Sequence, residues 1–178
     1  ILTADFNGDG NLDLVTANAN GDNIAIVLGA GNGSFGGPAY FPTSTQPNSI
    51  TWGDYNLDGK PDLAVTNYGA NSVSVLLGNG SGGFGAASNF NVGSGPPFVL
   101  TADFNGDTKP DLVTANRYSN GVSVLLNACS SQSLNPAITV TPTTLDFGSV
   151  ASGQTKDLTL TIGNTGSAAL LVTSINIT

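Results

Sequence analysis

An acidic loop of nine residues recurs in this chain at a constant interval, and no other sequence feature restricts the fold as strongly. The first copy reads Asp-Phe-Asn-Gly-Asp-Gly-Asn-Leu-Asp and spans residues 5–13; the second spans 54–62 and the third 103–111. Successive copies are 49 residues apart. A fixed period of about 20–50 residues is the signature of a repeat array in which each unit is one supersecondary structure. We therefore expect three similar structural units.

Each loop carries side-chain oxygens at positions 1, 3, 5 and 9, a spacing that fits a hard cation. Calcium takes about six to eight oxygen ligands, and a short loop can supply them when alternate side chains turn inward and the carbonyl at position 7 joins them. We predict three sites: Asp5, Asn7, Asp9, Asp13 and the carbonyl of Asn11; Asp54, Asn56, Asp58, Asp62 and the carbonyl of Lys60; and Asp103, Asn105, Asp107, Asp111 and the carbonyl of Lys109.

The residue types favour calcium over other metals. Three carboxylates with neutral oxygens suit a large ion, whereas magnesium retains its waters. Zinc and copper prefer nitrogen or sulfur, and the chain has no histidine. The alternative is that the Asn-Gly and Asp-Gly pairs simply form tight turns between strands without any metal.

The charge of the chain is concentrated in these loops. All twelve acidic residues are aspartate, nine of them lie in the three loops, and the net charge is −8. Three calcium ions would bring it to about −2, whereas carboxylates without metal would repel one another. With only four Lys or Arg residues, a nucleic-acid surface is excluded.

Short apolar segments flank each loop and predict β-strands. They span 1–6, 14–18 and 24–28 in the first unit, 50–55, 63–67 and 73–77 in the second, and 99–104, 112–116 and 122–126 in the third. A weaker fourth segment surrounds Tyr40 and Phe90 in the first two units, and the third unit lacks it. Four strands in about 40–50 residues predict one blade of a β-propeller.

The D-x-N-x-D-G-x-x-D loop, the following Asp-Leu-Val-Thr-Ala-Asn strand, the Val-Ser-Val-Leu-Leu-Gly-Asn-Gly strand and the Gly-Ser-Phe-Gly turn resemble FG-GAP or VCBS repeats over residues 1–127. These are the calcium-binding blades of integrin-alpha-like propellers. The resemblance implies an all-β propeller, usually of about seven blades, in secreted or surface proteins, with structural calcium and with blade faces used for adhesion. Three loops are too few to close such a propeller from this chain alone.

In the third loop, Thr108 replaces the glycine of position 6. A β-branched residue is strained at positive φ, so we expect this loop to bind calcium most weakly.

The repeat pattern stops after Leu126. Residues 128–137 are small and polar and predict a linker that contains the single cysteine, Cys129. Residues 138–178 alternate with period two, with strands expected at 138–142, 145–148, 157–162 and 170–177 and a turn at 164–166. Their Leu-Asp-Phe-Gly-Ser-Val and Leu-Thr-Ile-Gly-Asn-Thr-Gly words resemble the first half of immunoglobulin-like modules of the ASPM, SPD-2 and Hydin type, also found in choice-of-anchor surface proteins. The predicted fold is thus all-β: three propeller blades, a linker and a partial immunoglobulin-like sandwich.

No catalytic site is predicted, because the chain has neither histidine nor glutamate and no serine lies in a G-x-S-x-G elbow. Trp52, Tyr55, Tyr68 and Tyr118 are candidates for a sugar-stacking surface, with ordinary packing as the alternative.

We therefore expect a non-catalytic, calcium-stabilised binding or adhesion module, extracellular or at the cell surface, that contacts a protein or glycan ligand. One alternative is a structural subunit of an extracellular filament or other homo-oligomer. Another is a carbohydrate-recognising module of a larger secreted enzyme. No run of residues reaches the length of a membrane span, and we expect the chain to be an excerpt of a longer protein.

Overall fold

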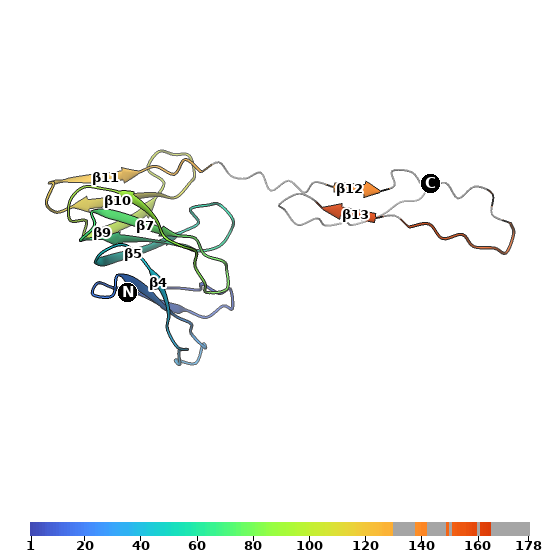
Figure 1. Ribbon diagram of the computed structural model, residues 1–178, viewed down its shortest axis with the longest axis horizontal. Coiled ribbons are helices and arrows are strands. Elements are labelled where there is room, and N and C mark those ends of the chain that lie inside the picture. Colours follow the sequence, from blue (N-terminus) through green and yellow to red (C-terminus); the bar gives the residue numbers. More distant parts are fainter. Residues whose placement is uncertain (130–137, 142–148, 150, 160, 165–178) are drawn as a thin grey trace. The chain divides into compact units, whose positions relative to one another are not determined.

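The computed structural model describes residues 1–129, 138–141, 149, 151–159 and 161–164, and all regular elements within these residues are β-strands. The chain divides into two compact units, Ile1–Ser130 and Ser131–Thr178. The first unit contains three antiparallel sheets, and the described part of the second contains one pair of strands (Figure 1). The all-β class predicted from the sequence is confirmed.

The three sheets of the first unit follow the three sequence repeats, and in each of them neighbouring strands are antiparallel and ordered as in the chain. The first sheet contains β1 (Leu2–Ala4), β2 (Asp13–Asn18), β3 (Asn23–Val27) and β4 (Ala39–Pro42); the second β5 (Pro47–Gly53), β6 (Asp62–Asn67), β7 (Ser72–Leu76) and β8 (Ser88–Asn91); the third β9 (Phe98–Ala102), β10 (Asp111–Asn116) and β11 (Gly121–Leu125). Among the described residues the third sheet has three strands, and β11 is its edge.

The first strand of each sheet ends earlier than predicted. β1 ends at Ala4 and β9 at Ala102, so that loop positions 1 and 2 lie outside the strands. The reason is that the N–H of position 2 leaves the ladder: Phe6 donates to Oδ2 of Asp13 at 2.8 Å. β5 instead begins early, at Pro47, and its register shifts between Pro47 and Ile50.

Apolar side chains line the two spaces between successive sheets. The first space is closed by residues such as Phe6, Val15 and Ile24 of the first repeat, together with Leu63 and Leu76 of the second. The second contains Tyr55, Ala64, Val73, Val99 and Leu112. Strand β6 lies between both layers, and all six of its residues are buried. The middle sheet is therefore covered on both faces.

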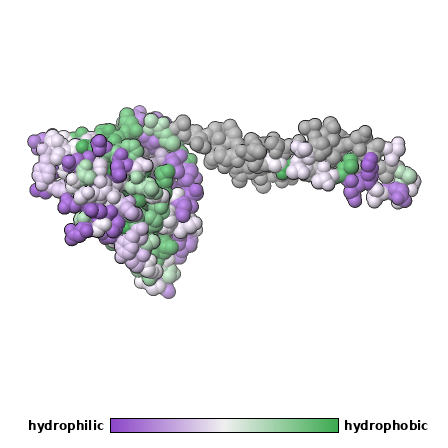
Figure 2. Space-filling model, in the orientation of Figure 1, coloured by the Kyte–Doolittle hydropathy of each residue, from purple (hydrophilic) through white to green (hydrophobic). Residues whose placement is uncertain are grey.

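One face of the third sheet is apolar and open to solvent. Its exposed side chains include Phe98 and Leu100 from β9 and Val122 and Val124 from β11. Apolar residues reach the surface along the edge of the repeat unit where β11 lies (Figure 2). This face carries the same repeat positions that bury Ile24 and Val73 in the first two sheets.

In the second unit, β12 (Ile138–Thr141) pairs with β13 (Thr161–Asn164). The strand predicted at 157–162 is wrong in position, because residues 157–159 are not in a strand and pairing begins at Thr161, opposite Thr141. Asn164, predicted to lie in a turn, ends β13 opposite Ile138 because the pairing matches the length of β12. The strands predicted at 145–148 and 170–177 and most of the predicted linker lie outside the described residues.

Candidate metal centres

The three acidic loops occupy equivalent places, each joining the first strand of a sheet to the second. They connect β1 to β2, β5 to β6 and β9 to β10. Within each loop the side chains at positions 1, 3 and 5 turn toward the backbone of their own loop. The sequence placed these residues correctly in one loop each, and the structure adds what each side chain contacts.

The aspartate at position 1 is the centre of each loop. In the first loop, Oδ1 of Asp5 accepts the N–H of Gly8 at 2.8 Å and Oδ2 accepts that of Gly10 at 2.8 Å. Asp54 accepts the N–H groups of Asp58 and Gly59 at 2.9 and 2.8 Å. Asp103 accepts those of Gly106 and Thr108 at 2.7 and 2.8 Å. All three loops thus share the hydrogen bond from the N–H of position 6 to Oδ2 of the position-1 carboxylate, and the first and third loops add one from position 4.

Positions 3 and 5 stabilise the next turn of the loop. Oδ1 of Asn7 accepts the N–H of Asp9 at 3.0 Å, and Oδ1 of Asp9 accepts the N–H of Asn11 at 2.8 Å. The hydrogen bond from the Asn11 backbone, with that from the Asn7 side chain, lowers the pKa of Asp9. Equivalent contacts form at Asn56 and Asp58 and at Asn105 and Asp107.

The lysines at position 7 fold back onto their own loops. Nζ of Lys60 lies 3.2 Å from Oδ2 of Asp58, and Lys109 makes the same contact with Asp107. A flexible stem of four carbons allows the ammonium to fold back onto the nearest carboxylate. Burial alone would raise the pKa of Asp58, but its hydrogen bonds from Lys60 outweigh burial and lower it. The first loop has Asn11 in this place and no cation.

The aspartate at position 9 has a structural role that the sequence analysis missed. Asp13, Asp62 and Asp111 are fully buried at the start of the second strand. One oxygen of Asp62 accepts the N–H of Tyr55 and the other that of Gly78, both at 2.8 Å. The carboxylate thus joins the loop to the turn after the third strand, and its burial raises the pKa of Asp62. The signal was that all three second strands begin with Asp-Leu, which places a charged residue at the start of an apolar segment.

Two non-glycine residues in the loops hold positive φ. Position 6 has φ of +84° at Gly10, +81° at Gly59 and +68° at Thr108, so Thr108 keeps the backbone path expected of the glycine that it replaces. Position 4 also has positive φ, and in the second loop it is Leu57, at +61°. The sequence analysis did not identify this second strained position.

The loops fit a calcium ion in donor chemistry and only in part in arrangement. Each offers three carboxylates and an amide oxygen, which are calcium ligands. In the part of the chain that the structure describes, however, no three acidic or cysteine side chains gather closely enough to hold a metal ion. Both oxygens of the position-9 carboxylate already accept backbone N–H groups, at Asp13 from Phe6 and Gly29.

The aromatic residues proposed for sugar stacking do not form one surface. Tyr55 is buried between the second and third sheets, whereas Trp52 is half exposed on β5. Tyr68 and Tyr118 meet beyond the ends of β6 and β10, with a hydrogen bond of 2.7 Å between their hydroxyls and ring centroids 5.9 Å apart. Tyr68 lines a small cavity of about 270 Å³ together with Asn48 and Arg117.

Comparison with known proteins gives one family. The FG-GAP-like repeat matches this chain twice, over residues 5–65 and 54–114, and each match begins at position 1 of an acidic loop. The two matches together cover more than half of the chain. No curated protein matches. In the described residues, no helix is long and apolar enough to cross a membrane.

Proposed function

The chain belongs to the FG-GAP-like repeat family, and from this membership we propose that it is a non-catalytic, calcium-stabilised binding module of the β-propeller type. Proteins with these repeats are typically extracellular, and we place this one outside the cell or at its surface. The observation that carries the proposal is that three loops, 49 residues apart, fold around the carboxylates of Asp5, Asp54 and Asp103 with the same hydrogen bonds.

In this proposal the side chains at positions 1, 3 and 5 and the carbonyl at position 7 supply most of the calcium ligands. Position 9 contributes without losing its structural role, because each carboxylate oxygen has two lone pairs and at Asp13 the backbone uses one on each oxygen. Bound calcium would neutralise carboxylates that otherwise repel one another across a short loop.

We further propose that residues 1–127 are three blades, 128–137 a linker and 138–178 part of an immunoglobulin-like sandwich. The ligand of the module is a protein or a glycan at a surface. Open sheet faces such as that of Phe98 and Val122 favour assembly with further blades or with other copies of the chain, which keeps the filament subunit as the alternative.

One observation favours glycan recognition as a second candidate. Tyr118 is largely exposed and carries the guanidinium of Arg117 5.5 Å from its ring centroid. Its hydroxyl accepts that of Tyr68, which lines the 270 Å³ cavity with Arg117. An aromatic face beside polar groups is a common sugar platform. A glycan array that gives the same signals for the wild type and for Tyr118→Ala would rule out this candidate.

Thermal unfolding with and without calcium tests the main proposal. A ligand that binds only the folded state stabilises it by RT ln(1 + [L]/Kd), about 2.7 kcal/mol per site at a hundredfold excess over Kd. We expect the melting temperature of the repeat unit to rise in calcium and to fall in chelator, with a much smaller effect of magnesium. The variant Asp5→Ala, Asp54→Ala, Asp103→Ala should lose the calcium response. An identical melting temperature in calcium and in chelator would refute calcium binding.

A further inference from the structure

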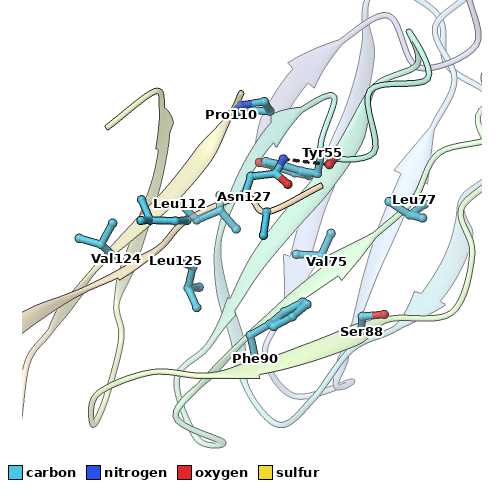
Figure 3. Close-up of a pocket in the computed structure, with 12 residues that line it drawn as sticks. Tyr55, Val75, Leu77, Ser88, Phe90, Pro110, Leu112, Val124, Leu125 and Asn127 are labelled. Carbon is cyan, nitrogen blue, oxygen red and sulfur yellow. Dashed lines mark hydrogen bonds between the residues drawn. The ribbon is translucent and has the colours of Figure 1, made fainter. Parts of the chain in front are cut away.

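A deep apolar pocket opens between the second and third sheets, at the edge strand β11. Its volume is about 590 Å³, and its walls include Tyr55, Val75 and Phe90 from the second repeat and Leu112, Leu125 and Leu126 from the third. In Figure 3 the side chains of Val75, Phe90 and Leu125 border the same opening. A cavity of this size and apolar character is typical of ligand sites.

The equivalent space between the first and second sheets is filled by an aromatic ring of the chain itself. Phe84, in the turn after β7, places its ring against Phe6 and Phe41, with centroids 5.8 and 5.5 Å away and edge-to-face geometry. Tyr55 and Phe90 stand 49 residues after these two partners and line the pocket. The position 49 residues after Phe84 is Ser133, which has no ring. The pocket therefore corresponds to the place of Phe84 in the preceding interface.

Within the described residues, the pocket also has no counterpart of the strand that follows the ring in the first two sheets. In the first two sheets a glycine follows the turn phenylalanine and donates its N–H to a carbonyl at the end of the third strand. Gly36 donates to Leu28 and Gly85 to Leu77, both at 2.8 Å. A fourth strand then pairs with the third. Among the described residues nothing pairs with the outer edge of β11. An edge strand with open N–H and C=O groups accepts an added strand.

The polar end of the pocket already has its hydrogen bonds. In the first interface the carbonyl of Phe6 accepts the N–H of Gly82 at 3.0 Å. In the second, the carbonyl of Tyr55 accepts Nδ2 of Asn127 at 2.9 Å (Figure 3). The apolar wall of the pocket and the N–H and C=O groups on the outer edge of β11 remain uncovered among the described residues. An aromatic ring together with an added strand would cover both.

We propose that this pocket and the edge of β11 form a binding site for an extended peptide of a partner protein that carries phenylalanine followed by glycine and a short strand. The ring enters the pocket beside Tyr55 and Phe90, the glycine N–H binds the carbonyl of Leu126, and the strand pairs with β11 as β8 pairs with β7. This goes beyond the proposed function, since neither calcium nor the adhesive faces take part.

The test uses the full 178-residue protein and a labelled peptide with the sequence of residues 81–92, which occupies the equivalent place in the chain's second sheet. Fluorescence anisotropy measures binding, and hydrogen exchange measures protection of β11. We expect saturable binding, slower exchange of the outer amides of β11, and at least tenfold weaker binding of the peptide carrying Phe84→Ala. Leu77→Asn and Leu126→Asn, both half-exposed positions that line the pocket, should weaken binding about tenfold.

The matched control is Leu12→Asn, the same substitution at an exposed leucine outside the pocket, which should bind the peptide as the wild type does. Equal binding of the Phe84→Ala peptide, or unchanged exchange in β11, would overturn the proposal. Peptide binding that appears only in the Phe147→Ala variant would also overturn the proposal, because the chain's own Phe147-Gly148 would then occupy the pocket in the wild type. Melting in calcium is a separate measurement, so failure of the calcium proposal would not affect this result.

Discussion

Nζ of Lys60 and Oδ2 of Asp58 lie 3.2 Å apart across the mouth of the second loop. Lys109 stands in the same relation to Asp107 in the third loop, whereas the first loop has Asn11 at this position. In two of the three loops an ammonium group therefore already neutralises the carboxylate at position 5. A metal ion entering these loops has to displace the ammonium, and the first loop is free of this competition.

The first prediction is that removing the lysine strengthens calcium binding. Lys60→Asn should raise the calcium affinity of the second loop by about two- to fivefold, a modest factor because exposed ion pairs are weak. The reverse change, Asn11→Lys, should lower the affinity of the first loop by a similar factor. Calorimetric titration of each variant, with the other loops disabled at position 1, measures both. Unchanged affinity in Lys60→Asn would show that the ion pair does not compete.

The second prediction concerns strain at Thr108. A β-branched residue at φ of +68° is unfavourable, and glycine adopts this conformation without steric cost. Thr108→Gly should stabilise the repeat unit by about 1 kcal/mol in urea denaturation and tighten the third calcium site. Gly10→Ala is the control in the opposite direction, since it introduces a Cβ at φ of +84°. Equal stability of Thr108→Gly and the wild type would refute the strain argument.

Leu57, at position 4 of the second loop, gives the third prediction. Leu57→Gly should stabilise by less than Thr108→Gly, because leucine lacks β-branching and because glycine adds entropy to the unfolded chain. Denaturation of the two variants side by side measures the difference. Calcium affinity should therefore decrease from the first loop to the second and from the second to the third. A third loop that binds calcium more tightly than the first would contradict this order.

The fourth prediction separates structure from metal binding at position 9. Asp62→Ala leaves the buried N–H groups of Tyr55 and Gly78 without their acceptor, and each such loss costs about 1–3 kcal/mol. We expect destabilisation by about 2–5 kcal/mol even in chelator. Asp54 is only partly buried and accepts N–H groups that water can reach, so Asp54→Ala should instead lose stability mainly in calcium. Equal behaviour of the two variants in chelator would mean that Asp62 has no structural role of its own.

A buried amide in the middle sheet supplies the fifth prediction. Oδ1 of Asn116 accepts the hydroxyl of Thr114 at 3.1 Å, but the equivalent Oδ1 of Asn67 has no partner because Val65 stands where the other repeats have threonine. Thr114→Val should destabilise by about 1–3 kcal/mol, since it leaves a second such oxygen unsatisfied.

The matched variant is Val65→Thr, which gives Asn67 a hydroxyl at the cost of one methyl group in the core. It should change the free energy of unfolding by less than about 1 kcal/mol. Chemical denaturation measures both variants. A destabilisation of Val65→Thr as large as that of Thr114→Val would contradict the assignment.

The fold of the repeat unit could be predicted from the sequence because the three repeats share one period. Each repeat has alternating or wholly apolar segments at the same three positions, and this restricts the order and pairing of the strands. The loops lie where the aspartates predicted them. The boundaries at Ala4 and Ala102 could not be predicted, because they depend on an N–H that leaves the ladder for a carboxylate seven or more residues away.

The sequence predicted which residues share each loop but not what their side chains contact. Residue type and spacing identify the side chains of each loop, yet nothing in the spacing says that Asp13 faces Phe6 and Gly29 while Asp5 faces its own loop. The fold of Lys60 onto Asp58 was likewise invisible, because a flexible side chain finds its partner only once the loop exists. The pocket beside β11 lies where the third repeat has Ser133 in place of an aromatic residue. The periodic pattern alone does not show that the space of this missing ring stays open.

Because the middle sheet is buried on both faces, the three repeats do not tolerate amino-acid substitutions equally, although their sequences are alike. Ile24 and Val73 are fully buried, whereas Val122, at the same repeat position, is 69% exposed. A library of all single substitutions should therefore tolerate polar residues at Val122 and reject them at Val73. Over evolutionary time the middle repeat would change most slowly and keep the ancestral sequence best. A consensus drawn equally from the three repeats would mix positions under very different selection.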